Sequence, residues 1–194
     1  MDECGSSSTA IPTDKLHLLK ELETIEVKGC ESVKQVFDLE GLSADDRLLH
    51  QLRELRLINL PKLTHLCNKN PQGILDFKYL WSLKLENCGS LKYAFTQSTV
   101  LCLSKLKKLE LKSCKMMEGL IEAAAGSDNY IVFPELQSVA LEDLPKFLSL
   151  ECPSVTNISI HDCPKLKMQP FISILNERED QKQVSLSLFF PYLN

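Results

Sequence analysis

A pattern of spaced leucines, L-x-x-L-x-L-x-x-[C/L], recurs along the chain and limits what it can fold into. The six copies begin at Leu22, Leu52, Leu80, Leu106, Leu136 and Val155. A single copy would be weak evidence. Six copies in register indicate that the whole chain is built from one repeated structural unit.

The physical reading of one copy predicts a strand followed by a turn. The central L-x-L alternates with period two, so its leucines face one side and the residues between them face solvent. No unit can bury its leucines alone, and the units must therefore stack. The spacing of roughly 20 to 30 residues is typical of leucine-rich repeats. We predict an α/β leucine-rich-repeat solenoid with a curved parallel β-sheet on the concave face and irregular loops and short helices on the convex face.

The pattern also predicts the domain organisation. Residues 1–14 are polar and are expected to form a flexible N-terminal tail, residues 15–168 hold about six repeats, and residues 169–194 form a C-terminal extension or cap. No cap is evident before Leu16, so the apolar edge of the first repeat is expected to be open. Residues 95–105 are expected to include a helical turn or two.

Composition excludes several classes of protein. Hydrophobic residues make up 44% of the 194 residues, enough for a continuous core. The net charge of −4 argues against a general nucleic-acid binder. Charged residues interrupt every apolar run well short of ~18 residues, so we expect no membrane span. The N-terminus lacks the features of a secretory signal, which predicts a cytoplasmic location, with the nucleus as the alternative.

Four of the eight cysteines share one position of the repeat. They are Cys30, Cys88, Cys114 and Cys163, and all stand at the turn after a strand. A small, weakly polar side chain fits a buried turn. We predict free thiols at these four positions rather than a disulfide scaffold, because a reducing compartment disfavours disulfides.

The sequence offers no recognisable catalytic or metal site. His161, Asp162 and Cys163 are adjacent, but strand alternation turns the histidine to solvent and the cysteine to the core. The chain holds no phosphate-binding loop and no nucleophile elbow. We therefore expect no enzyme activity, no cofactor and no metal.

What the repeats provide is an exposed surface. On repeats two to four the outward positions carry six basic residues against three acidic ones. Trp and Arg are the residues most enriched at interaction hot spots. The predicted protein-binding residues of the concave face are Arg53, Arg56, Trp81, Lys84, Lys107, Lys108 and Lys112. The alternative is that these are ordinary solvated positions of a sheet.

Four short motifs carry a family resemblance: N-C-x-x-L from Asn87, C-K-M-M-E from Cys114, V-F-P-x-L-x-S from Val132 and E-D-L-P-K from Glu142. With them, residues 16–168 resemble the C-terminal repeat domain of plant intracellular immune receptors. These are the nucleotide-binding, leucine-rich-repeat disease-resistance proteins of the coiled-coil class.

The resemblance implies a role in plant defence. In that family this domain holds the receptor inactive and helps to recognise pathogen effectors or the host proteins that they modify. The implied partners are an effector, a host target or a nucleotide-binding domain upstream of this chain, and the chain is then a fragment, a truncated product or a stand-alone repeat protein. The alternative function is a leucine-rich-repeat substrate receptor of a ubiquitin ligase.

Overall fold

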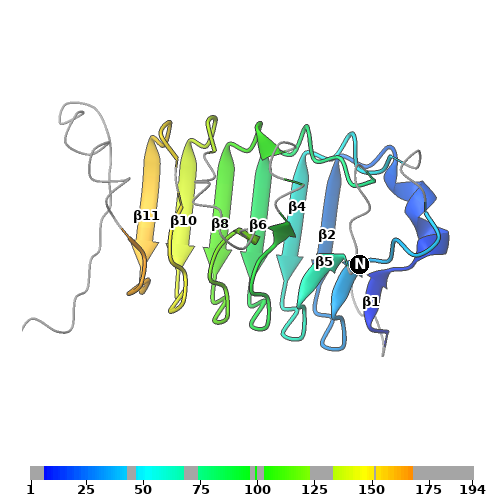
Figure 1. The fold of residues 1–194 in the computed structure, drawn as a ribbon, viewed down its shortest axis with the longest axis horizontal. Coiled ribbons are helices and arrows are strands. Elements are labelled where there is room, and N and C mark those ends of the chain that lie inside the picture. The colour runs from blue at the N-terminus through cyan, green and yellow to red at the C-terminus, as the bar shows by residue number, and fades with distance from the viewer. Residues whose placement is uncertain are drawn as a thin grey trace, which may run out of the picture.

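The computed structural model is a solenoid of stacked parallel strands (Figure 1). It describes residues 7–42, 47–67, 74–96, 99, 103–122, 133–150 and 152–167. The main sheet has six strands in the order β11-β10-β8-β6-β4-β2. They are β2 (Thr24–Lys28), β4 (Glu54–Ile58), β6 (Ser82–Glu86), β8 (Lys108–Lys112), β10 (Ser138–Glu142) and β11 (Asn157–His161). Each repeat contributes one strand, which confirms the predicted fold class.

The inward residues of these strands build the core. In β4, Leu55 and Leu57 are fully buried, while the residues on either side of them are exposed or partly exposed. The parallel register sets Leu83 of β6 between Leu55 and Leu109 of β8. The leucines of successive repeats therefore stack in continuous rows. Burial of one such side chain contributes about 1.5–3 kcal/mol, which explains why the pattern repeats so strictly.

A left-handed residue ends each main strand and turns the chain into the core. The φ angles of Asn59, Asn87, Ser113, Asp143 and Asp162 lie between 52° and 55°, and Gly29 has φ 70°. Asn, Asp and Gly tolerate this conformation best, and Ser113 alone departs from that preference. The following turn residues Leu60, Cys88, Cys114 and Leu144 are fully buried.

The turn cysteines follow the prediction in part. Cys88 and Cys114 are free, buried thiols, and each donates a long hydrogen bond to a carbonyl of the preceding repeat. Cys163 is free but only partly buried, so its predicted burial is wrong. It ends the last described repeat, where no further described repeat packs over it. The prediction for Cys30 is also wrong, because this residue is disulfide-bonded.

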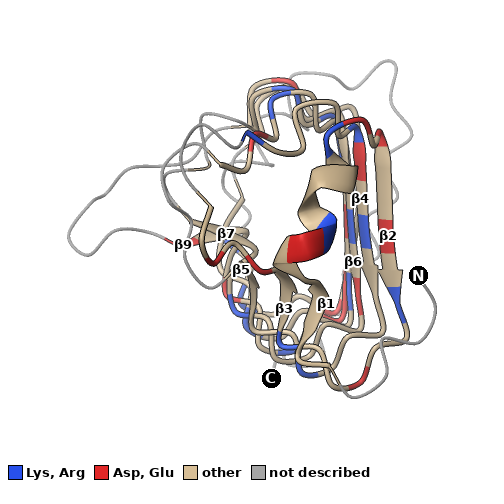
Figure 2. Cartoon of the chain, turned by 90° about the vertical axis from the view of Figure 1, so that its right-hand side faces the viewer, with Lys and Arg blue, Asp and Glu red and all other residues tan. Residues whose placement is uncertain are grey.

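Short second strands, rather than helices, form much of the opposite side of the solenoid. They are β1 (Thr9–Ile11), β3 (Gln35–Phe37), β5 (His65–Cys67), β7 (Phe95–Thr96) and β9 (Ile121–Glu122). Figure 2 looks along the stack and shows the main sheet on one side and these strands on the other. They form two separate parallel groups, β1-β3-β5 and β7-β9. The segment 95–105, expected to include a helical turn or two, begins as strand β7, and its residues Thr99 and Leu103 have 3₁₀-helical conformation.

The N-terminal end is more ordered than expected. Strand β1 pairs with β3, and the 3₁₀ helix η1 (Thr13–Leu19) follows it. Leu16 and Leu19 of this helix are buried. Residues 9–14, assigned to a flexible tail, therefore belong to the structured stack. The first repeat still keeps an open edge, since Leu22 is 40% exposed whereas the matching Leu52 is fully buried. The predicted C-terminal extension, residues 169–194, lies outside the described residues.

Candidate functional site: the exposed face of the main sheet

Backbone hydrogen bonds align the residues that precede the main strands into one row. The Trp81 N–H donates to the Arg53 carbonyl at 3.0 Å, and the Lys107 N–H donates to the Trp81 carbonyl at 2.9 Å. The three side chains therefore stand side by side on adjacent repeats. Trp81 is 38% exposed, so its ring is available to a partner. These are three of the seven residues predicted for the site.

The other four predicted residues lie on the strands beside this row. Register pairs Arg56 with Lys84, and Lys108 and Lys112 bracket β8. Strand alternation directs all of them to solvent, because their neighbours in each strand are the buried leucines. The structure thus places all seven predicted side chains together, on and just before β4, β6 and β8.

The charge of this surface differs from the prediction. Every basic residue of the set lies within 4 Å of a carboxylate. The pairs are Arg53–Glu23 (3.5 Å), Arg56–Glu54 (2.6 Å), Arg56–Glu26 (3.9 Å), Lys84–Glu86 (2.9 Å), Lys107–Glu135 (3.9 Å), Lys108–Glu110 (2.6 Å) and Lys112–Glu142 (3.0 Å). The prediction compared the charges of repeats two to four only. It therefore left out acidic residues of repeats one and five that pair with the basic residues. The surface is a lattice of paired charges rather than a basic patch.

These ion pairs are exposed and so contribute little to stability. Their effect is on recognition, since a partner must match alternating charges rather than supply one sign. Hydrogen bonding to Glu142 raises the pKa of Lys112, and hydrogen bonding to Lys105 lowers the pKa of Glu135. Both pKa shifts favour the charged forms of these two residues.

The last two strands present a different surface. Their outward residues are small and uncharged at Ser138, Ala140, Asn157 and Ser159. Ala140 lies in register between Glu110 and Ser159, and because its side chain is short, a hollow of about 130 Å³ opens there. Sequence reasoning missed this hollow. The signal was present, since alanine is the smallest outward residue of the six main strands.

Catalytic and metal-binding arrangements are not evident in the described ranges. No group of three His, Cys, Asp or Glu side chains in them is placed to hold a metal ion. His161 Nε2 lies 3.1 Å from Ser159 Oγ, and Cys163 points back toward its own strand. None of the helices within the described part of the chain is long and apolar enough to cross a membrane.

Stacked parallel strands with an aligned, exposed face define the chain as a leucine-rich-repeat solenoid, a typical non-enzymatic interaction module. The comparison with family models agrees. Residues 1–115, more than half of the chain, match the model for "Plant disease resistance protein RPS2-like, leucine-rich repeats". The chain belongs to this family of plant disease-resistance repeats, as its motifs suggested. No solved structure matches the chain significantly.

Proposed function

We propose that the chain is the protein-recognition module of a plant intracellular immune receptor, and that it acts through the exposed face of the main sheet. Its ligand is a pathogen effector or a host target, and its contact with the rest of the receptor holds that receptor inactive. A cytoplasmic location is part of the proposal. The family match favours this assignment over a substrate receptor of a ubiquitin ligase.

The row Arg53–Trp81–Lys107 is the observation that carries the proposal. The fold does not need these side chains, because other, buried apolar side chains fill the core. An aromatic ring that stands exposed between two long cations has the chemistry of an interaction hot spot. The paired charges around it would give specificity rather than bulk affinity.

A site-specific crosslinking experiment tests this. A photoreactive phenylalanine analogue replaces Trp81, the chain is expressed in leaf tissue, and the adducts after irradiation are identified by mass spectrometry. The matched control places the analogue at Tyr79, which is 50% exposed but lies two residues before the row. We expect a discrete protein adduct at position 81 that is lost when Lys84→Glu is added. Equal adducts at both positions, or an adduct insensitive to Lys84→Glu, would contradict the assigned face.

A further inference from the structure

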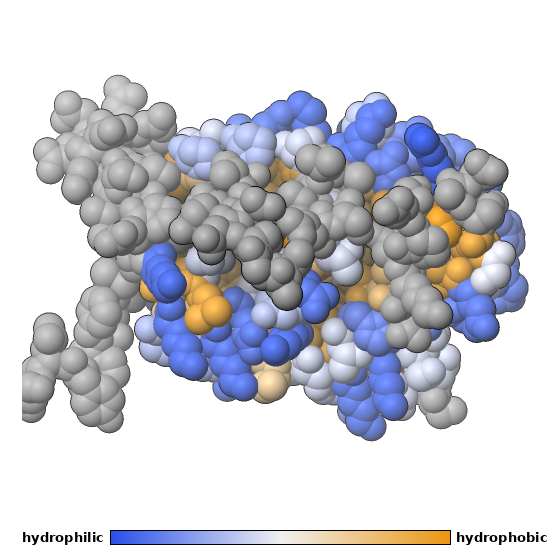
Figure 3. All heavy atoms as spheres, in the orientation of Figure 1, coloured by the Kyte–Doolittle hydropathy of each residue, from blue (hydrophilic) through white to orange (hydrophobic). Residues whose placement is uncertain are grey.

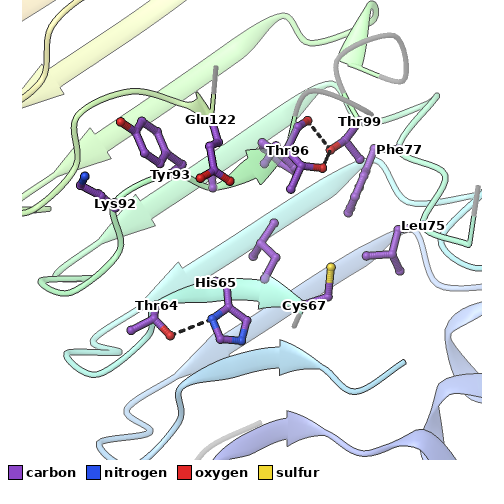
Figure 4. A pocket seen from close by; sticks show the side chains of 13 residues that line it. Thr64, His65, Cys67, Leu75, Phe77, Lys92, Tyr93, Thr96, Thr99 and Glu122 are labelled. Carbon is purple, nitrogen blue, oxygen red and sulfur yellow. Dashed lines mark hydrogen bonds between the residues drawn. The ribbon is translucent and has the colours of Figure 1, made fainter. Parts of the chain in front are cut away.

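A cavity lies where the second strands stop pairing. Strands β5 and β7 belong to successive repeats, yet they are not hydrogen-bonded to each other. A cavity of about 240 Å³ opens between them on the side of the molecule opposite the sheet face (Figure 4). In the same orientation as Figure 1, Figure 3 shows separate patches of apolar residues between hydrophilic areas along the upper and lower edges of this side.

The floor of the cavity is apolar and closely packed. Leu66, Leu75, Phe77 and Phe95 line it, and each is at most 4% exposed. The two phenylalanine rings meet edge to face, with centroids 5.3 Å apart. A cavity of ~150 Å³ lined by such residues can hold a benzene-sized group. This one therefore has room for a leucine or phenylalanine side chain together with part of its backbone.

One wall of the cavity is an open strand edge. The His65 N–H donates to the Lys34 carbonyl on the β3 side. The backbone groups of successive residues in a strand point to opposite sides, so the N–H and C=O of Leu66 point away from β3 and toward the cavity. Among the strands that the structure describes, β5 pairs only with β3. Such an edge is a template for one more strand.

The rim carries one charge that the described residues do not neutralise. Lys92 pairs with Glu118 at 3.2 Å, and the His65 ring is hydrogen-bonded to Thr64 and Gln35. Glu122 at the end of β9 is exposed and has no ion-pair partner in the described part of the chain. Figure 4 shows its carboxylate beside the cavity. An occupant with a Lys or Arg side chain at this end would be favoured.

We propose that this gap is a second peptide-binding site, in which an extended segment of a protein partner adds to β5. The segment pairs with the Leu66 backbone, sets one aliphatic or aromatic side chain on the Phe77–Phe95 floor and directs a cation to Glu122. Strand addition of this kind draws affinity from main-chain hydrogen bonds and selectivity from pockets for alternate side chains. The site is separate from the sheet face, so it does not depend on the function proposed for that face.

Titration of short peptides into the ¹⁵N-labelled full chain tests the proposal. The probes are acetylated and amidated pentapeptides Thr-Val-X-Val-Lys, with X as Leu, Phe or Ala. We expect saturable shifts of the Leu66 and Ala94 amides with Leu and Phe, and affinity at least roughly tenfold lower with Ala, because the floor then loses most of its contact. N-methylation of alternate peptide amides should weaken binding by roughly fivefold, since strand hydrogen bonds are lost.

Two variants give matched controls. Ala94→Leu fills the cavity and should abolish binding. Glu122→Gln should lower affinity for the Lys peptide by roughly two- to fivefold without changing that for a Gln peptide, whereas Glu21→Gln, at an exposed acid in another repeat, should change neither.

Several outcomes would overturn the site. They are equal affinity for the Ala and Leu peptides, undiminished binding of the N-methylated peptide, or shifts that map to Ser138 and Ala140 on the sheet face. Leu66 shifts that depend on protein concentration without peptide would also do so, because they would assign the gap to a second copy of this chain.

Discussion

The main sheet and the second strands are built from the same repeats, yet one is continuous and the other is interrupted. All six main strands pair in a single register, whereas the second strands break between β5 and β7. The consensus L-x-x-L-x-L specifies the main strand of every repeat. An apolar residue is buried again three positions after the turn, but the segments beyond that residue differ in sequence and length between repeats. Strand pairing is therefore continuous where the leucines repeat in every unit, and it is interrupted where the repeats differ from one another.

The largest expected effect is on the core of the main sheet. Leu83→Ala should cost about 2–5 kcal/mol of unfolding free energy, because Leu83 is packed between two other strands. Leu66→Ala should cost less, about 1–2 kcal/mol, since one side of Leu66 already borders a cavity and has fewer contacts to lose. Urea denaturation followed by circular dichroism measures both values.

Trp81→Ala is the control for that comparison. The ring is exposed and should contribute no more than about 0.5 kcal/mol. A loss as large as that of Leu83→Ala would make Trp81 a core residue and remove the basis of the proposed recognition row. Equal losses for Leu83 and Leu66 would show that the interrupted side is packed as tightly as the sheet.

The next largest expected difference between the main sheet and the second strands is in the rate of amide hydrogen exchange. The amide of Leu85, in the interior of the sheet, is bonded within a strand that has partners on both sides. The Leu66 amide faces the cavity, and we expect it to exchange at least roughly 100-fold faster under native conditions. Exchange resolved by residue in NMR spectra checks this. Similar protection at both amides would mean that the edge of β5 is already covered.

Thiol reactivity should also be higher on the side of the second strands than at the turns of the main sheet, by a smaller factor than hydrogen exchange. Cys67 of β5 is partly exposed, and burial raises its pKa to about 11. The thiolate is the reactive form, so labelling of Cys67 should accelerate roughly tenfold per pH unit up to that value. Cys88 and Cys114 are fully buried, and the neighbouring Cys114 thiol together with burial raises the pKa of Cys88. Both should label only as the protein unfolds.

Mass spectrometry of labelled peptides gives the order of reaction. Labelling of Cys88 or Cys114 before Cys67 would contradict the burial of the turn. The same spectra under non-reducing conditions test the disulfide at Cys30, which the repeat pattern did not anticipate.

These contrasts show which features a single sequence can predict. The six strands, the buried Leu55 and Leu83, and the exposure of Trp81 all follow from alternation within one repeat. The charge of the sheet face did not follow, because Glu23 and Glu142 reach basic residues on neighbouring repeats, and only the register sets that contact. The gap beside Leu66 also could not be predicted, because it depends on how neighbouring repeats stack. The sequence within one repeat does not show which second strands pair.

A further prediction concerns a side-chain hydrogen bond between repeats three and four, close to strands β7 and β9. Tyr93 Oη donates to Glu118 Oε2 at 2.7 Å. This bond lowers the pKa of Glu118 and raises that of Tyr93 to about 12. The ionised Glu118 therefore adds stability above its ordinary pKa of 4.5, and this is lost as the pH falls through the lowered value. The protonated Tyr93 adds stability below the ordinary pKa of 10.0, and this is lost as the pH rises through about 12.

Tyr93→Phe should lower the free energy of unfolding slightly near neutral pH, because this hydrogen bond is lost. The measurement is urea unfolding of the two proteins at neutral pH and again below the ordinary Glu118 pKa, where the difference between them should shrink. Tyr79→Phe, at an exposed ring, is the matched control and should show no such convergence. A difference between Tyr93→Phe and the parent chain that persists unchanged in acid would mean that the hydroxyl stabilises the fold by packing.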